Sequence, residues 1–277
     1  MLQTNILVIA GMHRSGTSMV THWLHTCGLN VGENLLGAGV GNIEGHYEDT
    51  DFYRLHVDHL LENNLPYTGF VKDAPPPFSQ KTKETLAGII AAKNKKSAQW
   101  GWKDPRTCLF LNEYDQLLPG AKYLIIYRDF SSTVSSMISR IIKNKDIKHN
   151  RRKWLHRLYW NTIGRKIKQQ WILWRNSNLF LHVWLLYNRN LLDLASKIDS
   201  DNYIIVNYKT LLDDDTKVFS TLKNKWHFSL NYIAFSNIYQ PKLLSKVLNI
   251  EPYASARLIR EARAVMQSLE ALEKKNV

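Results

Sequence analysis

Cysteine is scarce in this chain of 277 residues, where only Cys27 and Cys108 occur. Neither belongs to a CxxC pair or to a pattern of zinc ligands, which argues against a disulfide framework and against a structural zinc site. We expect both thiols to be reduced core residues, which fits a reducing compartment.

Long apolar runs are also missing. A membrane-spanning helix needs about 18 consecutive apolar residues. The densest apolar patch, residues 179–187, is interrupted by His182 and is far too short. The first apolar segment begins near residue 5, too close to the start for a signal peptide. The sequence therefore predicts a cytoplasmic protein.

Acidic residues are outnumbered, with 24 Asp or Glu against 37 Lys or Arg and a net charge of +13. A basic chain favours anionic partners, although plain solubility is the alternative. The segment 143–175 alone carries eleven cations and one acid, interleaved with Trp154, Trp160, Trp171 and Trp174. Cations beside aromatic faces suit an acidic sugar, or an amphipathic helix on anionic lipid. Peripheral membrane contact is thus one expectation for this segment.

Four short apolar segments are predicted to be strands, at residues 5–10, 98–102, 123–127 and 203–206. Helical patterns lie between them, at about 15–27, 49–63, 79–94, 107–118 and from 131 onward. This alternation predicts an α/β fold with a parallel central sheet flanked by helices.

We expect one domain over residues 1–277, with a basic, tryptophan-rich helical insert at 143–200 and a C-terminal helix at 253–277. The last helix carries a narrow apolar seam: Leu258, Ala262, Val265, Leu269 and Leu272. Such a seam is expected to pack on the parent domain, with a dimer contact as the alternative.

The stretch "GMHRSGTS", residues 11–18, follows the first predicted strand and precedes a helix. Gly11 and Gly16 have the spacing of a phosphate-binding loop, but Thr17 stands where such a loop has its lysine, and Arg14 lies inside the loop. The unpaired N–H groups of a helix start favour an anion. The alternative is a glycine turn that serves shape alone.

A second candidate anion site follows the strand at 123–127, which ends in Arg128 and not in a metal-binding Asp. In the next helix Val134, Met137, Ile138 and Ile141 form the core face, while Ser132, Ser136 and Arg140 share the other face. Open α/β sheets bind ligands at the carboxyl ends of their strands. We expect Arg128, Ser136 and Arg140 to hold a phosphate, and the alternative is a solvated helix face.

Together these two blocks resemble sulfotransferases that use 3′-phosphoadenosine 5′-phosphosulfate (PAPS). Residues 11–18 resemble the 5′-phosphosulfate loop of that family. Residues 102–140, "WKDPRTCLFLNEYDQLLPGAKYLIIYRDFSSTVSSMISR", are similar to its segment from a KDP turn to the helix that holds the 3′-phosphate. The likeness is closest to bacterial and tyrosylprotein-type members, and it extends weakly to 206–212. It implies the P-loop NTPase-like sulfotransferase fold.

The resemblance also implies roles for individual residues. Arg14 and Lys103 would contact the phosphosulfate as catalytic cations, and no metal would be needed. The phosphate would be cradled by Ser15, Gly16, Thr17 and Ser18. The 3′-phosphate would be held by Arg128, Ser136 and Arg140. Tyr208 would lie near the nucleotide, unless it is only a core residue at a strand end.

Two further parts of the site are less defined by the sequence. The RKG segment of cytosolic sulfotransferases is absent, so Lys242 and Lys246 are weak candidates for closing over the nucleotide. The resemblance implies a general base after the first predicted helix, where the candidates are Glu44, Glu48, Asp49, Asp51 and His56. Glu48, at the start of a predicted helix, is preferred, and Glu33 is the rival. His13 is expected to form a wall of the nucleotide site and not the base.

The sequence thus predicts a sulfotransferase that moves a sulfuryl group from PAPS to an acceptor hydroxyl. A carbohydrate or glycolipid acceptor is preferred because of the basic, tryptophan-rich segment, and a peptidyl tyrosine stays open. The alternatives are a P-loop kinase or NTPase with a degenerate loop, and a non-enzymatic basic protein that binds nucleic acid or membrane. No nucleic-acid partner is expected for the enzyme, and the oligomeric state stays open.

Overall fold

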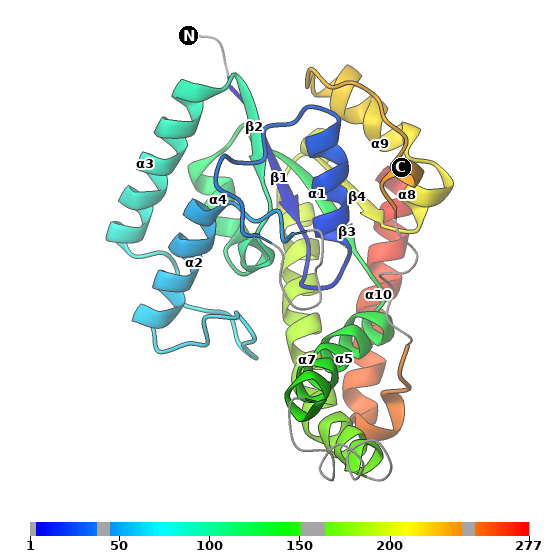
Figure 1. Ribbon diagram of the computed structural model, residues 1–277. Helices are drawn as coiled ribbons and strands as arrows, with labels where there is room; N and C mark the ends of the chain where they lie inside the picture. The colour runs from blue at the N-terminus through cyan, green and yellow to red at the C-terminus, as the bar shows by residue number, and fades with distance from the viewer. Residues whose placement is uncertain (1–3, 38–44, 151–163, 240–246, 277) are drawn as a thin grey trace.

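The computed structural model describes residues 4–37, 45–150, 164–239 and 247–276 (Figure 1). Four strands form one parallel sheet in the order β2-β1-β3-β4. They are β1 (Asn5–Ala10), β2 (Gln99–Trp102), β3 (Lys122–Tyr127) and β4 (Tyr203–Asn207). In the central strand Val8 pairs with Trp102 on one side and with Tyr123 on the other. The predicted α/β fold with a parallel sheet is confirmed.

The strand order decides where a ligand can bind. The chain passes from β1 to β2 on one side and then crosses to β3 and β4 on the other. Loops that leave neighbouring strands in opposite directions open a crevice at their carboxyl ends. By this rule the binding crevice is expected between β1 and β3, whose carboxyl ends lead into the segments that contain Arg14 and Arg128.

Helices cover both faces of the sheet, which explains why β1 reads as the apolar run "ILVIA" after Asn5. On one face Leu7 and Ile9 pack with Val20 and Trp23 of the first helix. The helices are α1 (Thr17–Thr26), α2 (Thr50–Glu62), α3 (Gln80–Lys96), α4 (Leu111–Leu117), α5 (Phe130–Asn150), α7 (Arg165–Lys197), α8 (Thr210–Asp213), α9 (Thr216–Ser220) and α10 (Ala256–Asn276). The two cysteines are free and buried, as predicted.

One predicted helix is divided in the structure. Residues 107–118 were expected to form a single helix, but a 3₁₀ turn spans Pro105–Leu109 and α4 begins only at Leu111. The physical reason is local, because the Asp104 side chain caps the turn by accepting from the backbone N–H of Arg106. Proline at the first position of the turn has no N–H to leave unpaired there.

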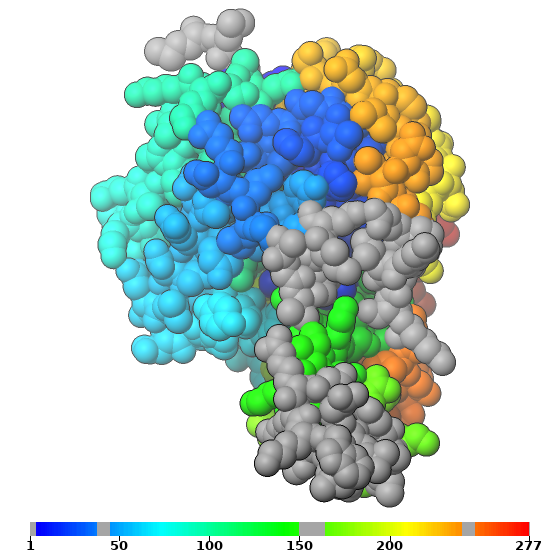
Figure 2. Space-filling model, in the orientation of Figure 1, coloured from blue at the N-terminus to red at the C-terminus, as the bar shows by residue number. Residues whose placement is uncertain are grey.

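Helices α5, α7 and α10 extend past the sheet and form a projection at the bottom of Figure 1, which also stands out in the space-filling view (Figure 2). The apolar seam of α10 is buried at Leu258, Ala262, Val265 and Leu269, and the helix packs against α7 and β4. We call the described part of the projection around the end of α5 and the first half of α7 the arm (residues 143–149 and 164–176).

Where it is described, the expected insert at 143–200 is mostly helical, but only part of it projects from the rest of the molecule. From Ser177 onward α7 is largely buried, through Phe180, Leu181 and Trp184, so this half belongs to the core. The remaining sequence-predicted members, Arg151, Arg152, Lys153, Trp154, Arg157 and Trp160, lie outside the described residues. Among the helices of the described ranges, none combines the length and the apolar character that crossing a bilayer requires.

Candidate active site

The loop after β1 is shaped by its two glycines. Gly16 has a φ of 102°, a left-handed conformation that favours glycine, and a Cβ there would lie 3.1 Å from the Cβ of Tyr208. A Cβ on Gly11 would collide with the carbonyl oxygen of Ile126 in β3. The loop is thus held tightly against the crevice, and α1 begins directly after it.

The loop hydroxyls have different surroundings. The buried Ser15 Oγ donates to the Met12 carbonyl at 2.7 Å, so this serine fixes the turn itself. Thr17 is buried in the first turn of α1, and Ser18 Oγ accepts from Lys103 Nζ at 3.4 Å. Because Gly16 gives α1 no side-chain cap, the first N–H groups of the helix are suited to an anion.

Three arginines gather where β1 and β3 end. Arg14 Nε donates to Ser136 Oγ at 2.9 Å, and Arg128 Nη1 donates to the Arg14 carbonyl at 3.1 Å. Burial, together with the neighbouring charges of Arg140 and Arg128, lowers the pKa of Arg14 to about 10. Like charges held together in this way are suited to a polyanionic ligand.

Arg128 gives a second indication that an anion binds here. Its guanidinium lies 5.2 Å from the centre of the Tyr208 ring. Its buried Nε has no hydrogen-bond partner among the described residues. Buried donors are rarely left unpaired, so this atom points to a group that binds here.

Ser136 was expected to hold the 3′-phosphate together with Arg128 and Arg140. In the structure Ser136 is buried, and its hydroxyl accepts a hydrogen bond from Arg14. Tyr208 is buried at the base of the loop, below Gly16 and beside Arg128. It therefore lies at the candidate site and is also a packed strand-end residue.

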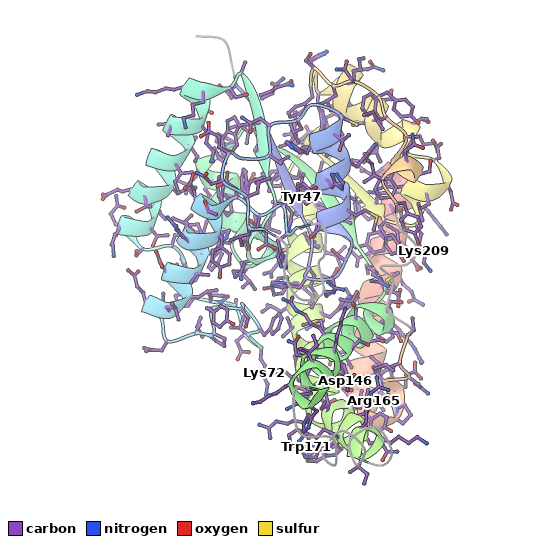
Figure 3. All side chains as sticks on the ribbon, in the orientation of Figure 1. Tyr47, Lys72, Asp146, Arg165, Trp171 and Lys209 are labelled. Atoms are coloured by element: carbon purple, nitrogen blue, oxygen red, sulfur yellow. The ribbon has the colours of Figure 1, made fainter. Side chains whose placement is uncertain are left out.

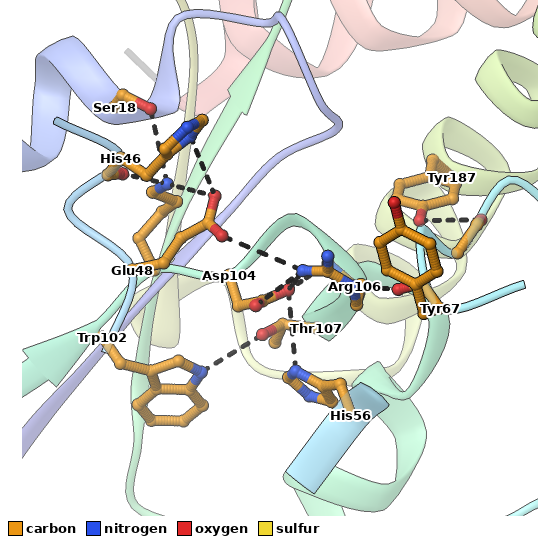
Figure 4. Close-up of polar contacts among 12 residues, drawn as sticks. Ser18, His46, Glu48, His56, Tyr67, Trp102, Asp104, Arg106, Thr107 and Tyr187 are labelled. Carbon is orange, nitrogen blue, oxygen red and sulfur yellow. Dashed lines mark hydrogen bonds and ion pairs between the residues drawn. The ribbon is translucent and has the colours of Figure 1, made fainter. Parts of the chain in front are cut away.

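Lys103 follows β2 directly and is buried next to the loop. Its partners Ser18, His46 and Glu48 are labelled in Figure 4. Its Nζ donates to Glu48 Oε1 at 2.9 Å and to the His46 carbonyl at 2.5 Å. Glu48 lies just before Asp49, the N-cap of α2, and so precedes the helix that it was expected to begin. Two of the predicted catalytic residues, 55 positions apart, are thereby brought into direct contact.

Glu33, the rival base, has different surroundings. It is exposed and forms an ion pair with Lys96 of α3 at 2.7 Å. Exposed pairs of this kind contribute little to stability and are common on protein surfaces. Of the two candidate bases, the structure places Glu48 beside Lys103.

Behind Lys103 lies a buried polar network that the sequence reasoning did not assign. Arg106 Nη1 binds both carboxylate oxygens of Asp104, at 3.0 and 2.9 Å. Burial alone would raise the pKa of Asp104, but the charge of Arg106 and the nearby His56 ring, whose Nδ1 lies 3.6 Å from Asp104 Oδ1, hold it well below its usual range. Arg106 Nη1 also lies 3.9 Å from Glu48 Oε2. The sequence signal that could have revealed this network is the "DPR" that follows Lys103.

His13 forms part of the wall near this network. Its ring meets Phe70 edge-on at 5.1 Å, and its Nε2 has no hydrogen-bond partner within the described ranges. Burial, together with the nearby charge of Arg106, lowers the pKa of His13 to about 3. The imidazole is therefore neutral at pH 7 and packs as an aromatic ring.

Two other expectations concerned a metal ion and the lysines that would close over the nucleotide. Within the described ranges, no group of three or more His, Cys, Asp or Glu side chains is placed to hold a metal ion. Lys242 and Lys246 lie outside the residues that the structure describes.

Comparison with known proteins gives a likeness of fold. No protein-family model matches the sequence, and no curated protein matches it at a significant level. A sulfotransferase from Mycobacterium avium is similar in structure, with a TM-score of 0.54 at 13% identity over 97% of this chain and 76% of that one. The sulfotransferase domain of an olefin synthase from Synechococcus is 16% identical over 98% of this chain and 95% of that one, with a TM-score of 0.47. At such identities the first likeness shows that the chain has the sulfotransferase fold.

Proposed function

We propose that the protein is a PAPS-dependent sulfotransferase, which transfers a sulfuryl group to an acceptor hydroxyl. One observation carries the proposal: Arg14, Arg128 and Arg140 gather at the strand ends beside the buried Lys103–Glu48 pair. This arrangement occurs on a chain that has the fold of a sulfotransferase.

The chemistry of the residues fits the co-substrate. PAPS carries anionic groups at two places, the 5′-phosphosulfate and the 3′-phosphate. Arg14 and the N–H groups at the start of α1 would hold the first, with Ser15, Gly16, Thr17 and Ser18 as the cradle. Arg128, whose Nε is unpaired among the described residues, would hold the second with Arg140 and Ser136. Tyr208 would support the nucleotide from below the loop.

When bound, PAPS supplies the sulfuryl group and leaves as adenosine 3′,5′-bisphosphate. Lys103 and Arg14 would offset the negative charge that grows on the leaving oxygen, which is a transition-state contact. Glu48 would take the proton of the acceptor hydroxyl. Its Oε1 is engaged by Lys103 at 2.9 Å, whereas Oε2 lies 3.9 Å from Arg106, too far for a hydrogen bond, so Oε2 can accept that proton.

For the acceptor we propose a carbohydrate or glycolipid. The support is the basic, tryptophan-rich character of residues 143–175, since aromatic faces and cations suit acidic sugars. A P-loop kinase is not favoured, because Thr17 replaces the loop lysine and Arg128 replaces the strand-end acid. A purely nucleic-acid- or membrane-binding protein is not favoured, because the chain has the sulfotransferase fold and places the buried Lys103–Glu48 pair beside the arginine cluster.

The deciding experiment is calorimetric titration with adenosine 3′,5′-bisphosphate, with and without a chelator of divalent metals. We expect binding that a chelator does not change, because protein cations neutralise the ligand. Binding that requires magnesium would overturn the proposal. Transfer from radiolabelled PAPS to panels of glycans, lipids and tyrosine peptides then tests the acceptor class, and label on peptides alone would overturn the carbohydrate assignment.

A further inference from the structure

The first half of α7 presents two apolar faces. Ile172 and Leu173 are buried and pack into the core. Ile167, Trp171 and Trp174 follow at steps of four and three, so they share another face of the helix. They are 60%, 41% and 68% exposed. The core does not use this outward stripe, and Trp174 in particular is a costly side chain to leave in water.

Cations surround the outward stripe. Lys168 Nζ lies 3.7 Å from the centre of the Trp171 ring, and the Arg175 guanidinium lies 5.3 Å from it. Across the described arm, seven Lys or Arg side chains face a single acid, Asp146, for a net charge of +6. That acid is itself neutralised by Arg165 at 3.1 Å. Asp146, Arg165 and Trp171 lie together at the end of the projection (Figure 3).

We propose that this end of the arm docks onto the surface of an anionic lipid bilayer. We call the docking residues the arm surface: Ile147, Ile167, Lys168, Trp171, Trp174 and Arg175. Tryptophan is enriched at the boundary between lipid and water, and basic side chains around an apolar stripe bind anionic headgroups. Ile147 of α5, 37% exposed, adds an aliphatic group to the arm.

Two other occupants fit the arm surface less well. An acidic glycan could meet the cations and the tryptophan faces, but it offers no apolar phase for Ile147 and Ile167. In a two-fold contact with a second copy of the chain, the cations of one arm would face the same cations of the other. The net charge of +6 on each arm opposes such a contact. Only a bilayer supplies both the negative charge and the apolar layer.

The arm surface lies close to the candidate active site along α5. Arg140 belongs to the arginine cluster and Ile147 to the arm surface, and seven residues of helix rise roughly 10 Å. Docking would therefore hold the crevice near the bilayer, where a lipid-linked acceptor would lie. The docking itself does not depend on the sulfotransferase proposal, since no residue of the arm surface belongs to the proposed nucleotide site.

The test is flotation of the full chain with phosphatidylcholine vesicles, with and without phosphatidylserine. We expect binding that needs phosphatidylserine and weakens at high salt. The Trp171→Ala/Trp174→Ala variant should lose roughly tenfold or more in affinity, because two interfacial side chains are removed. Its matched control is Leu61→Ala, which removes a 54% exposed side chain on α2 and should bind like the wild type.

A second pair of variants tests the charges. Lys168→Gln/Arg175→Gln should lose most of the dependence on phosphatidylserine, whereas Lys95→Gln/Lys223→Gln, with two exposed lysines elsewhere, should keep it. All variants should bind adenosine 3′,5′-bisphosphate as the wild type does, or keep its thermal unfolding midpoint if the wild type does not bind. This separates a failure of docking from a failure of the proposed function.

Three results would overturn the inference. One is equal flotation with and without phosphatidylserine. Another is full binding by a folded Trp171→Ala/Trp174→Ala variant. The third is a lipid-free dimer, seen by light scattering, that this same variant dissociates, because the arm surface would then be covered by a second copy.

Discussion

Arg128→Ala is the change that most directly tests the arginine cluster. Among the described residues this side chain makes one hydrogen bond, from Nη1 to the Arg14 carbonyl at 3.1 Å, and its guanidinium lies against the Tyr208 ring. Its buried Nε has no partner among the described residues. The substitution therefore removes a support of the loop and also the proposed contact to the 3′-phosphate.

These two losses differ in their ligand dependence. A charge-assisted hydrogen bond to a phosphate contributes about 1.5–3 kcal/mol, which corresponds to about 10- to 150-fold in affinity. The loss of the contact with the Arg14 carbonyl, about 0.5–1.5 kcal/mol, weakens the loop for any nucleotide. Only the first part requires a 3′-phosphate on the ligand.

Calorimetry with two ligands separates the parts. In the variant, the binding free energy of adenosine 3′,5′-bisphosphate should fall by the sum of the two contributions. That of adenosine 5′-monophosphate should fall only by the smaller contribution, from the support of the loop. The difference between the two losses is the coupling energy of Arg128 with the 3′-phosphate. Arg260→Ala, which removes an exposed arginine of α10, is the matched control and should change neither affinity.

Equal losses for the two ligands would refute the assignment. The coupling energy would then be zero, and Arg128 would act only by supporting the loop through Arg14. A thermal unfolding midpoint equal to that of the wild type shows that the comparison is made between folded proteins.

Three further predictions concern Glu48, Lys103 and His13. Glu48→Gln should lower turnover by about 10²–10⁴-fold with little change in PAPS affinity, because it removes the proposed base; steady-state kinetics that show only a raised KM would contradict this. Lys103→Ala should also lower turnover, and it should destabilise the fold by about 3–5 kcal/mol because Glu48 stays buried without Lys103. Adding Glu48→Gln should restore the stability, which urea titrations measure, but not the activity. The pKa of His13 is about 3 in the folded protein against a usual 6.5, so the unfolded chain binds more protons between these values and stability falls as pH drops below about 6.5. Urea unfolding near neutral pH and near pH 5 should show that His13→Gln loses about 2 kcal/mol less than the wild type over this range, and an identical pH dependence would show that His13 is not held neutral. The lowered pKa of His46 acts in the same direction in both proteins and cancels in the comparison.

The sequence by itself determined the four strands and the loop. The four strands are short apolar runs that need burial on both faces, and each was found within a residue or two of its observed bounds. Gly11 and Gly16 are local requirements of a tight turn before a helix, so their spacing was readable without a structure. Cations placed directly after strands, such as Lys103 and Arg128, also follow from local order, because parallel strands end at one edge.

Tertiary structure alone decided which of these residues meet. Glu48 and Glu33 both follow α1 in sequence, and only the path of the chain brings Glu48 to Lys103 and leaves Glu33 with Lys96. Ser136 binds Arg14 from 122 positions away, a pairing that no local pattern encodes.

The two faces of α7 were likewise invisible in the sequence. Its inner face is fixed by packing against distant elements of the core, and the outward face of Trp171 and Trp174 is defined only by that packing. A side chain's neighbours across the fold depend on the strand order and on where the helices pack. Both are set by how the whole chain buries its apolar surface, and not by any local stretch. Local residue patterns report the period of a helix or strand, and so they determine elements but not their contacts.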